Sequence, residues 1–113
     1  MLTIVETPEF IANAKTLMSE PEREDLIGYL AREPEAGALI PGTGGVRKLR
    51  WGLSGRGKRG GARVIYFFHS ARMPLFLLTV FAKNQRADLS QAERNGLQKL
   101  TRQLTESYRR SRR

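Results

Sequence analysis

Basic residues near the ends of three short apolar segments have the types and spacing of an anion-binding site. They are Lys48, Arg50, Arg63 and Lys83. Because alternate side chains of a β-strand point to the same face, Lys48 and Arg50 would lie side by side. Cations gathered in this way suit the oxygens of a phosphate group. The alternative is that they are ordinary solvated cations on one face of a sheet.

Cleavage of RNA by its own 2′-hydroxyl is a reaction that such a site can support. It needs a proton acceptor, a proton donor for the leaving 5′-oxygen, and positive charge beside the phosphorane oxygens. Lysine transfers protons where neighbouring cations lower its pKa, whereas arginine stays charged. Lys48 and Lys83 are therefore the acid and base candidates. Arg50 and Arg63 are the candidates for stabilising the oxyanion.

Charge is distributed unevenly along the 113-residue chain, whose net charge is +9. Residues 1–35 carry eight acidic and three basic side chains, residues 36–87 carry ten basic and none acidic, and residues 88–113 carry three acidic and seven basic. The cations of the middle window must therefore face the acidic first third, solvent or a polyanion. We expect nucleic acid as the partner, because phosphate neutralisation supplies most non-specific affinity. A merely soluble basic surface is the alternative.

A glycine-rich basic segment runs from Gly52 to Gly61, and its start has the Gly-x4-Gly-Lys spacing of a phosphate-binding P-loop. Arg59 stands where that loop needs a hydroxyl for magnesium, and the β-branched and aromatic residues after Arg63 predict a strand in place of a helix. We therefore expect a hairpin connection whose cations reach for RNA backbone. The predicted RNA-binding residues are Arg47, Arg56, Lys58, Arg59 and Arg86.

Capping signals and hydrophobic spacing predict the secondary structure. Strands are expected at residues 2–6, 46–51, 62–69 and 75–82, and residues 36–45 are expected to be a loop with tight turns. Helices are expected to start at Thr7-Pro8, at Ser19 with Glu22, and at Ser90 with Glu93. The basic tail, residues 109–113, is expected to be frayed.

Three consecutive strands with short connections predict an antiparallel meander with helices packed on one face, in a single α+β domain over residues 1–113. If residues 51 and 62 face each other, Arg50 lies opposite Arg63 and Lys48 lies opposite Ile65. Like charges facing across a sheet are destabilising by a fraction of a kcal/mol, on the order of 0.2–1 kcal/mol. Such a pair suggests a ligand anion between the two arginines.

Composition bounds the remaining possibilities. The chain has no cysteine, and His69 is its one histidine, so we expect no disulfide, no metal and no cofactor. The N-terminal residues lack a secretory signal, and the longest apolar run, residues 75–82, is far short of the roughly 20 residues that span a bilayer. We expect a cytoplasmic protein with no membrane partner.

Several aromatic residues have two interpretations. His69 is either a structural residue at a strand end or a rival for proton transfer. The residues Trp51, Tyr66, Phe67 and Phe68 are either core residues or surfaces on which bases stack. Strand alternation favours the core for Tyr66 and Phe68.

Three basic segments, in this order, resemble RelE-type toxins of bacterial toxin–antitoxin systems, and the HigB-like branch in particular. The segments are GTGGVRKLRW from Gly42, GKRGGARVIYFF from Gly57, and LTVFAKNQRADLS from Leu78. The resemblance extends over nearly the whole chain. It implies a RelE-like, microbial-ribonuclease-type fold in the order βααβββα.

The resemblance also implies an activity and partners. The activity is ribosome-dependent endonuclease cleavage of mRNA in the ribosomal A site, by attack of the 2′-hydroxyl on the scissile phosphate, which inhibits translation. The partners are the ribosome, mRNA and a cognate antitoxin, which in the HigB-like branch is HigA-like and carries a helix-turn-helix DNA-binding domain. Operator DNA would be contacted only through that antitoxin.

The family's active-site positions correspond here to Lys48, Arg50 and Arg63, and Lys83 matches a basic position after the third meander strand. Some relatives place a catalytic tyrosine where this sequence has Ala87 to Ser90. Two other functions stay open at this stage, because a fold does not fix a function. They are a ParE-like gyrase inhibitor and a non-catalytic RNA-binding module.

Overall fold

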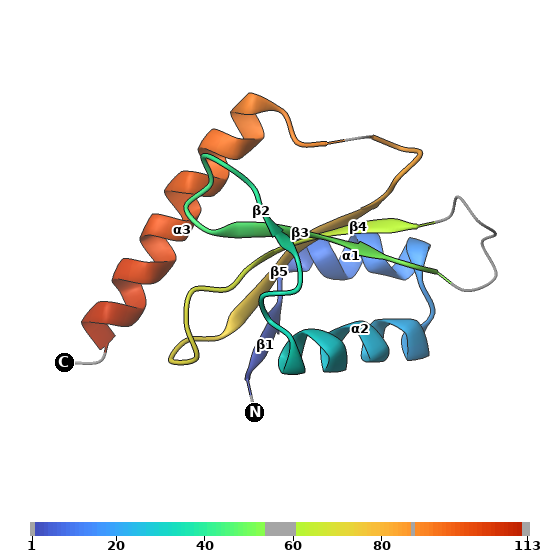
Figure 1. Ribbon diagram of the computed structural model, residues 1–113, viewed down its shortest axis with the longest axis horizontal. Helices are drawn as coiled ribbons and strands as arrows, with labels where there is room; N and C mark the ends of the chain where they lie inside the picture. Colours follow the sequence, from blue (N-terminus) through green and yellow to red (C-terminus); the bar gives the residue numbers. More distant parts are fainter. Residues whose placement is uncertain (1, 54–60, 87, 112–113) are drawn as a thin grey trace.

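A five-stranded sheet and three helices make up the structure, a computed structural model that describes residues 2–53, 61–86 and 88–111 (Figure 1). The strands are β1 (Ile4–Glu6), β2 (Ala38–Leu39), β3 (Val46–Trp51), β4 (Ala62–Phe67) and β5 (Leu75–Ala82). The helices are α1 (Pro8–Leu17), α2 (Glu20–Arg32) and α3 (Gln91–Ser111). The predicted α+β class is confirmed. None of the described helices is long and apolar enough to cross a membrane.

The strands lie in the order β1-β5-β4-β3-β2. The strand β1 runs parallel to β5, and the other pairs are antiparallel, as the predicted meander requires. The sequence pattern did not indicate β2, which adds two residues to the edge of the sheet beside β3. Two residues are too few to show a periodicity, so this part of the chain was expected to be a loop.

The expectation that all helices pack on one face of the sheet is corrected. One core cluster contains residues of α1 and α2, and a second cluster on the other face is covered by the half-buried α3 residues Leu97, Leu100, Leu104 and Tyr108. Figure 1 shows α2 and α3 on opposite sides of the sheet. Every residue of β4 is buried, and a strand buried on both sides needs a cover on both sides.

The predicted helix starts are confirmed. The Thr7 hydroxyl accepts a hydrogen bond from the Phe10 N–H and donates one to the Leu77 carbonyl at 2.9 Å, so it caps α1 and fastens it to β5. The capping boxes at the starts of α2 and α3 are also present. The helix α3 continues to Ser111, three residues into the segment that was expected to be frayed.

A tight turn before β3 holds α3 in place. The Thr101 hydroxyl of α3 donates to the Thr43 carbonyl at 2.9 Å, and both residues are buried. Gly44 has a φ of 80°, and a Cβ atom at this position would lie 2.4 Å from the Thr101 hydroxyl oxygen. The close approach therefore requires glycine, both for its backbone conformation and for the space.

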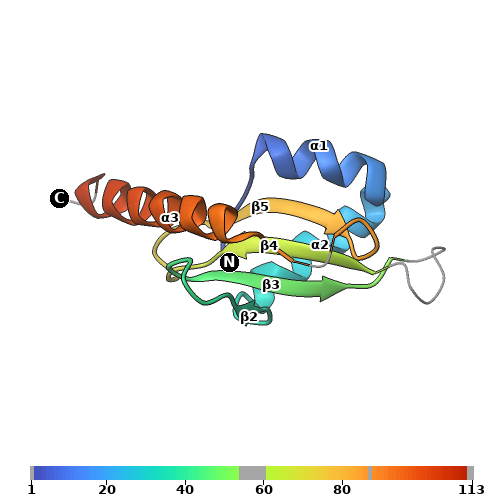
Figure 2. The same ribbon diagram turned by 90° about the horizontal axis from the view of Figure 1, so that it is seen from above.

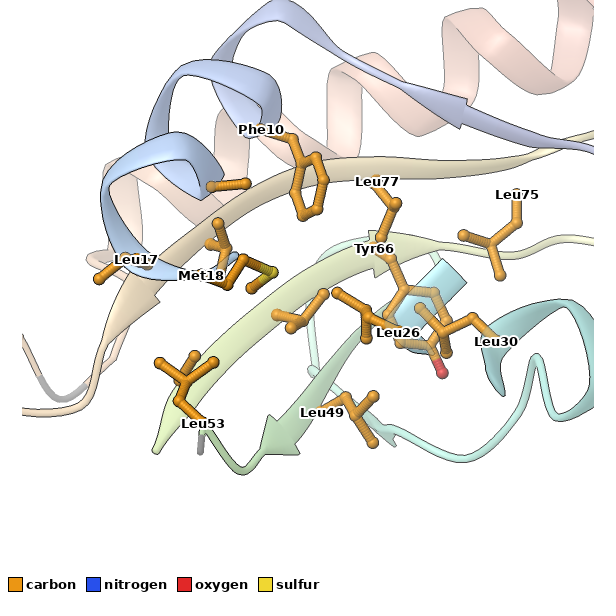
Figure 3. Packing of buried hydrophobic residues seen from close by; sticks show 14 residues of the cluster. Phe10, Leu17, Met18, Leu26, Leu30, Leu49, Leu53, Tyr66, Leu75 and Leu77 are labelled. Carbon is orange, nitrogen blue, oxygen red and sulfur yellow. The ribbon is translucent and has the colours of Figure 1, made fainter. Parts of the chain in front are cut away.

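Tyr66 of β4 occupies the centre of the core on the α1 and α2 side, among the leucines of α2 (Figure 3). It is completely buried, and burial raises the pKa of its hydroxyl, which stays neutral. The hydroxyl accepts from the Gly37 N–H at 2.8 Å and donates to the Pro34 carbonyl at 2.8 Å. One side chain thus ties the connection between α2 and β2 to the middle of the sheet.

Replacing this hydroxyl tests its role. The substitution Tyr66→Phe leaves the Gly37 N–H without its acceptor, so we expect a loss of about 1–3 kcal/mol in the free energy of unfolding. Tyr29→Phe is the control, because Tyr29 is half-buried and its hydroxyl has no hydrogen bond to a described residue. Urea denaturation measures both. Equal stability of the two variants would contradict the assignment.

Candidate functional site

The strands β3 and β4 pair in the predicted register. Arg50 lies opposite Arg63, and Lys48 lies opposite Ile65. Ile65 belongs to the core cluster under α3, so all three cations lie on the α3 side of the sheet. The prediction that two like charges face each other across the strands is therefore confirmed.

The two arginines differ in burial. Arg63 is 8% exposed and Arg50 is exposed, and the Arg63 Nη1 atom lies 3.5 Å from the Ala62 carbonyl oxygen that accepts its hydrogen bond. Neither arginine forms an ion pair with any residue that the structure describes. A buried charge without a counter-ion is costly, and an anionic ligand would lower that cost.

Lys48 has a counter-ion that the sequence interpretation missed. Its Nζ atom lies 3.4 Å from a carboxylate oxygen of Asp88, whose other oxygen lies 3.5 Å from Arg94 of α3. The Leu89 N–H donates to Asp88 at 2.8 Å, and this bond, followed by Lys48, holds the pKa of Asp88 below its usual value. Asp88 was missed because it is the first residue after the window without carboxylates.

Arg86 lies on the same face and is held from two directions. Its guanidinium carbon is 4.6 Å from the centre of the Phe81 ring, and Phe81 pairs with Arg63 in the sheet. Its Nη1 atom lies 2.7 Å from a carboxylate oxygen of Glu93. The hydrogen bond from the Ser90 N–H, and then Arg86, lower the pKa of Glu93. The capping box of Ser90 and Glu93 at the start of α3 therefore also holds Arg86 over the sheet.

Lys83 lies in the turn after β5, and its side chain is exposed. Its backbone N–H donates to the Gly61 carbonyl at 3.1 Å, which places it beside the start of β4. The structure thus brings Lys83 to the same end of the sheet as Arg50 and Arg63. These residues, together with Lys48, are called the cation set below.

Other predicted residues lie elsewhere. Arg47 points to the opposite face, where it donates to the carbonyls of Glu35 at 3.1 Å and Gly37 at 2.8 Å. His69 lies beyond the other end of β4, about 20 Å from Arg63 by the rise of a strand. The predicted RNA-binding residues Arg56, Lys58 and Arg59 lie outside the described residues.

The aromatic residues divide between core and edge. Tyr66 and Phe67 are completely buried in the two opposite core clusters, which confirms the core assignment of Tyr66. Phe68 is half-buried against the same cluster as Tyr66. Trp51 is half-buried too, and its ring centre lies 5.4 Å from that of Tyr29 on α2. Among the described residues, no group of three or more His, Cys, Asp or Glu side chains is placed to hold a metal ion.

A hollow of about 420 Å³ lies between α3 and β5, next to Arg86. Its apolar wall includes Ile65, Leu78 and Leu97, and Arg86 and Glu93 line its polar side.

The arrangement has the groups that phosphoryl chemistry needs. Arg63 is fixed in the sheet and Arg50 is open to solvent, so a phosphate between them would meet one rigid and one adjustable guanidinium. Lys48 comes from β3 and Lys83 from the turn after β5. The family model described as RelE toxin of RelE / RelB toxin-antitoxin system matches residues 34–111. That range includes the whole cation set, Arg86 and Asp88.

If Lys48 binds a phosphate group, Asp88 is its competitor, and removal of the Asp88 charge tests this competition. The substitution Asp88→Asn keeps an acceptor for the Leu89 N–H but removes the negative charge. We expect a fluorescein-labelled RNA 12-mer to bind two- to fivefold more tightly, since an exposed ion pair is worth about 0.2–1 kcal/mol. Fluorescence anisotropy at low salt measures this. Asp25→Asn, on the exposed side of α2, is the control. Unchanged or weaker binding by Asp88→Asn would contradict the competition.

Proposed function

Because the chain belongs to the RelE toxin family, we propose that it is a ribosome-dependent endoribonuclease that cleaves mRNA in the ribosomal A site and thereby inhibits translation. It is a toxin of a toxin–antitoxin system, and its family implies an antitoxin partner. The observation that best supports the activity is the pair formed by Arg50 and Arg63, in which one guanidinium is buried without a described counter-ion.

The reaction that these residues support is transesterification at a phosphodiester. The 2′-oxygen attacks the adjacent phosphorus atom and loses its proton, and the bond from phosphorus to the 5′-oxygen breaks as that oxygen gains a proton. The products carry a 2′,3′-cyclic phosphate and a 5′-hydroxyl. Arg50 and Arg63 bind the non-bridging oxygens, where negative charge develops in the transition state. Lys48 and Lys83 exchange the two protons.

The composition of the cation set supports the proposed dependence on the ribosome. His69 is about 20 Å away by the rise of β4, and no described histidine or glutamate lies in the cation set to act as an independent proton-transfer pair. The ribosome would supply part of the catalysis by holding the codon so that the 2′-oxygen, the phosphorus and the leaving 5′-oxygen lie in line for the attack. The protein acts in the cytoplasm, where ribosomes and mRNA are found.

We assign the chain to the HigB-like branch on the three sequence segments that resemble it. The partner is then a HigA-like antitoxin with a helix-turn-helix domain, and operator DNA is bound only through that antitoxin. A ParE-like action on gyrase has less support, because the cation set suits attack on a phosphodiester that has its own 2′-hydroxyl.

Sequencing of RNA ends after brief induction without the antitoxin tests the proposed function. We expect new 5′-hydroxyl ends at consistent codon positions of translated mRNAs, and no cleavage of the same RNAs by the purified protein without ribosomes. Arg50→Ala should reduce cleavage by about 10²–10³-fold, as expected for loss of one group that stabilises the oxyanion. Lys15→Ala, an exposed cation on α1, should cleave like the wild type.

Growth arrest with intact mRNA and inhibited DNA supercoiling would overturn this proposal in favour of gyrase. Equal cleavage by Arg50→Ala and the wild type would overturn the assigned site. Circular dichroism of each variant shows whether the fold is kept.

A further inference from the structure

The two lysines of the cation set have different surroundings. The Lys48 Nζ atom lies 3.4 Å from one carboxylate oxygen of Asp88, and the other oxygen lies 3.5 Å from Arg94 of α3. Lys83 is exposed and forms no ion pair with a described residue. A carboxylate stabilises the charged form of a lysine, whereas neighbouring cations favour the neutral form. The two lysines are therefore not equivalent as proton-transfer groups.

The charged groups that face Lys48 come from the segment between β5 and α3 and from α3 itself. Its neighbours in the sheet, Ala38 of β2 and Ile65 of β4, carry no charge. The Leu89 N–H donates to Asp88 at 2.8 Å, so the carboxylate is held by its own backbone segment. Figure 2 shows that this segment turns back from the end of β5 toward the start of α3. The segment thus brings a fixed negative charge to Lys48.

Lys83 has positive charge near it and no carboxylate. Residues 36–87 contain no acidic side chain, so neither the turn after β5 nor the connection between β3 and β4 contains a counter-ion. The Lys83 N–H is bonded to the Gly61 carbonyl, two residues before Arg63. In the part of the chain that the structure describes, Arg50 and Arg63 are not paired with a carboxylate. Such surroundings favour the neutral amine, which is the form that accepts a proton.

The strand register places the two lysines on opposite sides of the arginine pair. Arg50, Arg63 and Phe81 lie in one row across β3, β4 and β5. Lys48 lies two residues from this row toward the middle of the sheet, and Lys83 follows Phe81 by two residues in the other direction. Two residues of strand are about 6.6 Å long. A phosphate between the arginines would therefore have one lysine on either side, as in-line attack and departure require.

We propose that Lys48 is the general acid of the cleavage, that Lys83 is the general base, and that Asp88 is the positioning residue that holds the Lys48 ammonium group. This inference rests on the proposed function. The neutral Lys83 amine takes the proton of the 2′-hydroxyl as the 2′-oxygen bonds to phosphorus. The Lys48 ammonium gives a proton to the 5′-oxygen as the bond between phosphorus and that oxygen breaks. Solvent then returns a proton to Lys48 and removes one from Lys83.

Replacing the leaving oxygen by sulfur tests this division of roles. A thiolate leaves without a proton near neutral pH, because the pKa of a thiol is about 8.5, whereas an alkoxide needs one. Purified ribosomes are programmed with mRNA that has oxygen or sulfur as the bridging 5′ atom where the wild type cuts the A-site codon. Single-turnover cleavage is measured with saturating toxin. A variant that lacks the acid is then slow on the oxygen substrate alone.

The two lysine variants should respond differently to sulfur. Lys48→Ala should cleave the oxygen substrate about 10²–10⁴-fold more slowly than the wild type, and the sulfur substrate at the wild-type rate. Lys48→Arg should behave in the same way, because arginine keeps its proton. Lys83→Ala should be slow on both substrates, because activation of the 2′-hydroxyl is lost. The reverse pattern, or equal losses on both substrates in both variants, would overturn the assignment.

Asp88→Asn tests the positioning role. It should cleave the oxygen substrate roughly 10–100-fold more slowly, as expected for a misplaced catalytic group, and sulfur should remove this loss. A residue with a structural role alone would slow both substrates alike, and that result would overturn the role of Asp88. Asp25→Asn, on the exposed side of α2, is the charge-matched control and should cleave both substrates like the wild type.

Cleavage of the oxygen substrate by the wild type is scored first. Its absence on programmed ribosomes would overturn the proposed function and this inference with it. Wild-type cleavage together with the wrong pattern among the variants would overturn this inference alone.

Discussion

The burial of β4 on both faces is the constraint on which the rest of the structure depends, and it holds Arg50 opposite Arg63 across β3 and β4. Facing like charges weaken a sheet, and the repulsion between the two arginines would fall if one strand slipped by a residue. A slip is prevented because β4 is buried on both faces, with Tyr66 in one core cluster and Ile65 in the other. Moving the strand by one position would exchange these side chains between two differently shaped cores. The core thus keeps two cations together that would otherwise separate.

The segment between β5 and α3 couples this pair to the rest of the molecule. It carries Arg86, which stacks on Phe81, and Asp88, which joins Lys48 to Arg94. Glu93 both starts α3 and binds Arg86. At the other end of the sheet, the contact of Thr101 with the turn at Thr43 fixes the position of α3. The helix is therefore attached at its start and at its middle.

Local rules predicted much of this arrangement. The strand register followed from hairpin geometry, and the helix starts followed from short capping motifs whose hydrogen bonds close within a few residues. The direction of Arg47 was also available, because the alternation that puts Lys48 and Arg50 on one face puts Arg47 on the other. The prediction that Arg47 binds RNA rested on its charge alone.

Other features depend on contacts between distant segments. The position of α3 on the second face could not be read from its own stripe of leucines, which shows that the helix packs but not against which surface. The uninterrupted apolar runs of β4 and β5 were the available signal, since they indicate strands covered on both sides. The pairing of Lys48 with Asp88 joins residues 40 positions apart, and no sequence spacing predicts it.

Thermal unfolding with and without inorganic phosphate tests most directly whether the Arg50 and Arg63 pair is held for an anion. At low salt, Arg50→Gln should unfold at a slightly higher temperature than the wild type, because a repulsion of about 0.2–1 kcal/mol is removed. Phosphate at ten times its Kd should stabilise the wild type by about 1.4 kcal/mol, several degrees in Tm, and should stabilise Arg50→Gln markedly less. Equal gains in the two proteins, with Lys15→Gln as the charge control, would contradict an anion site at this pair.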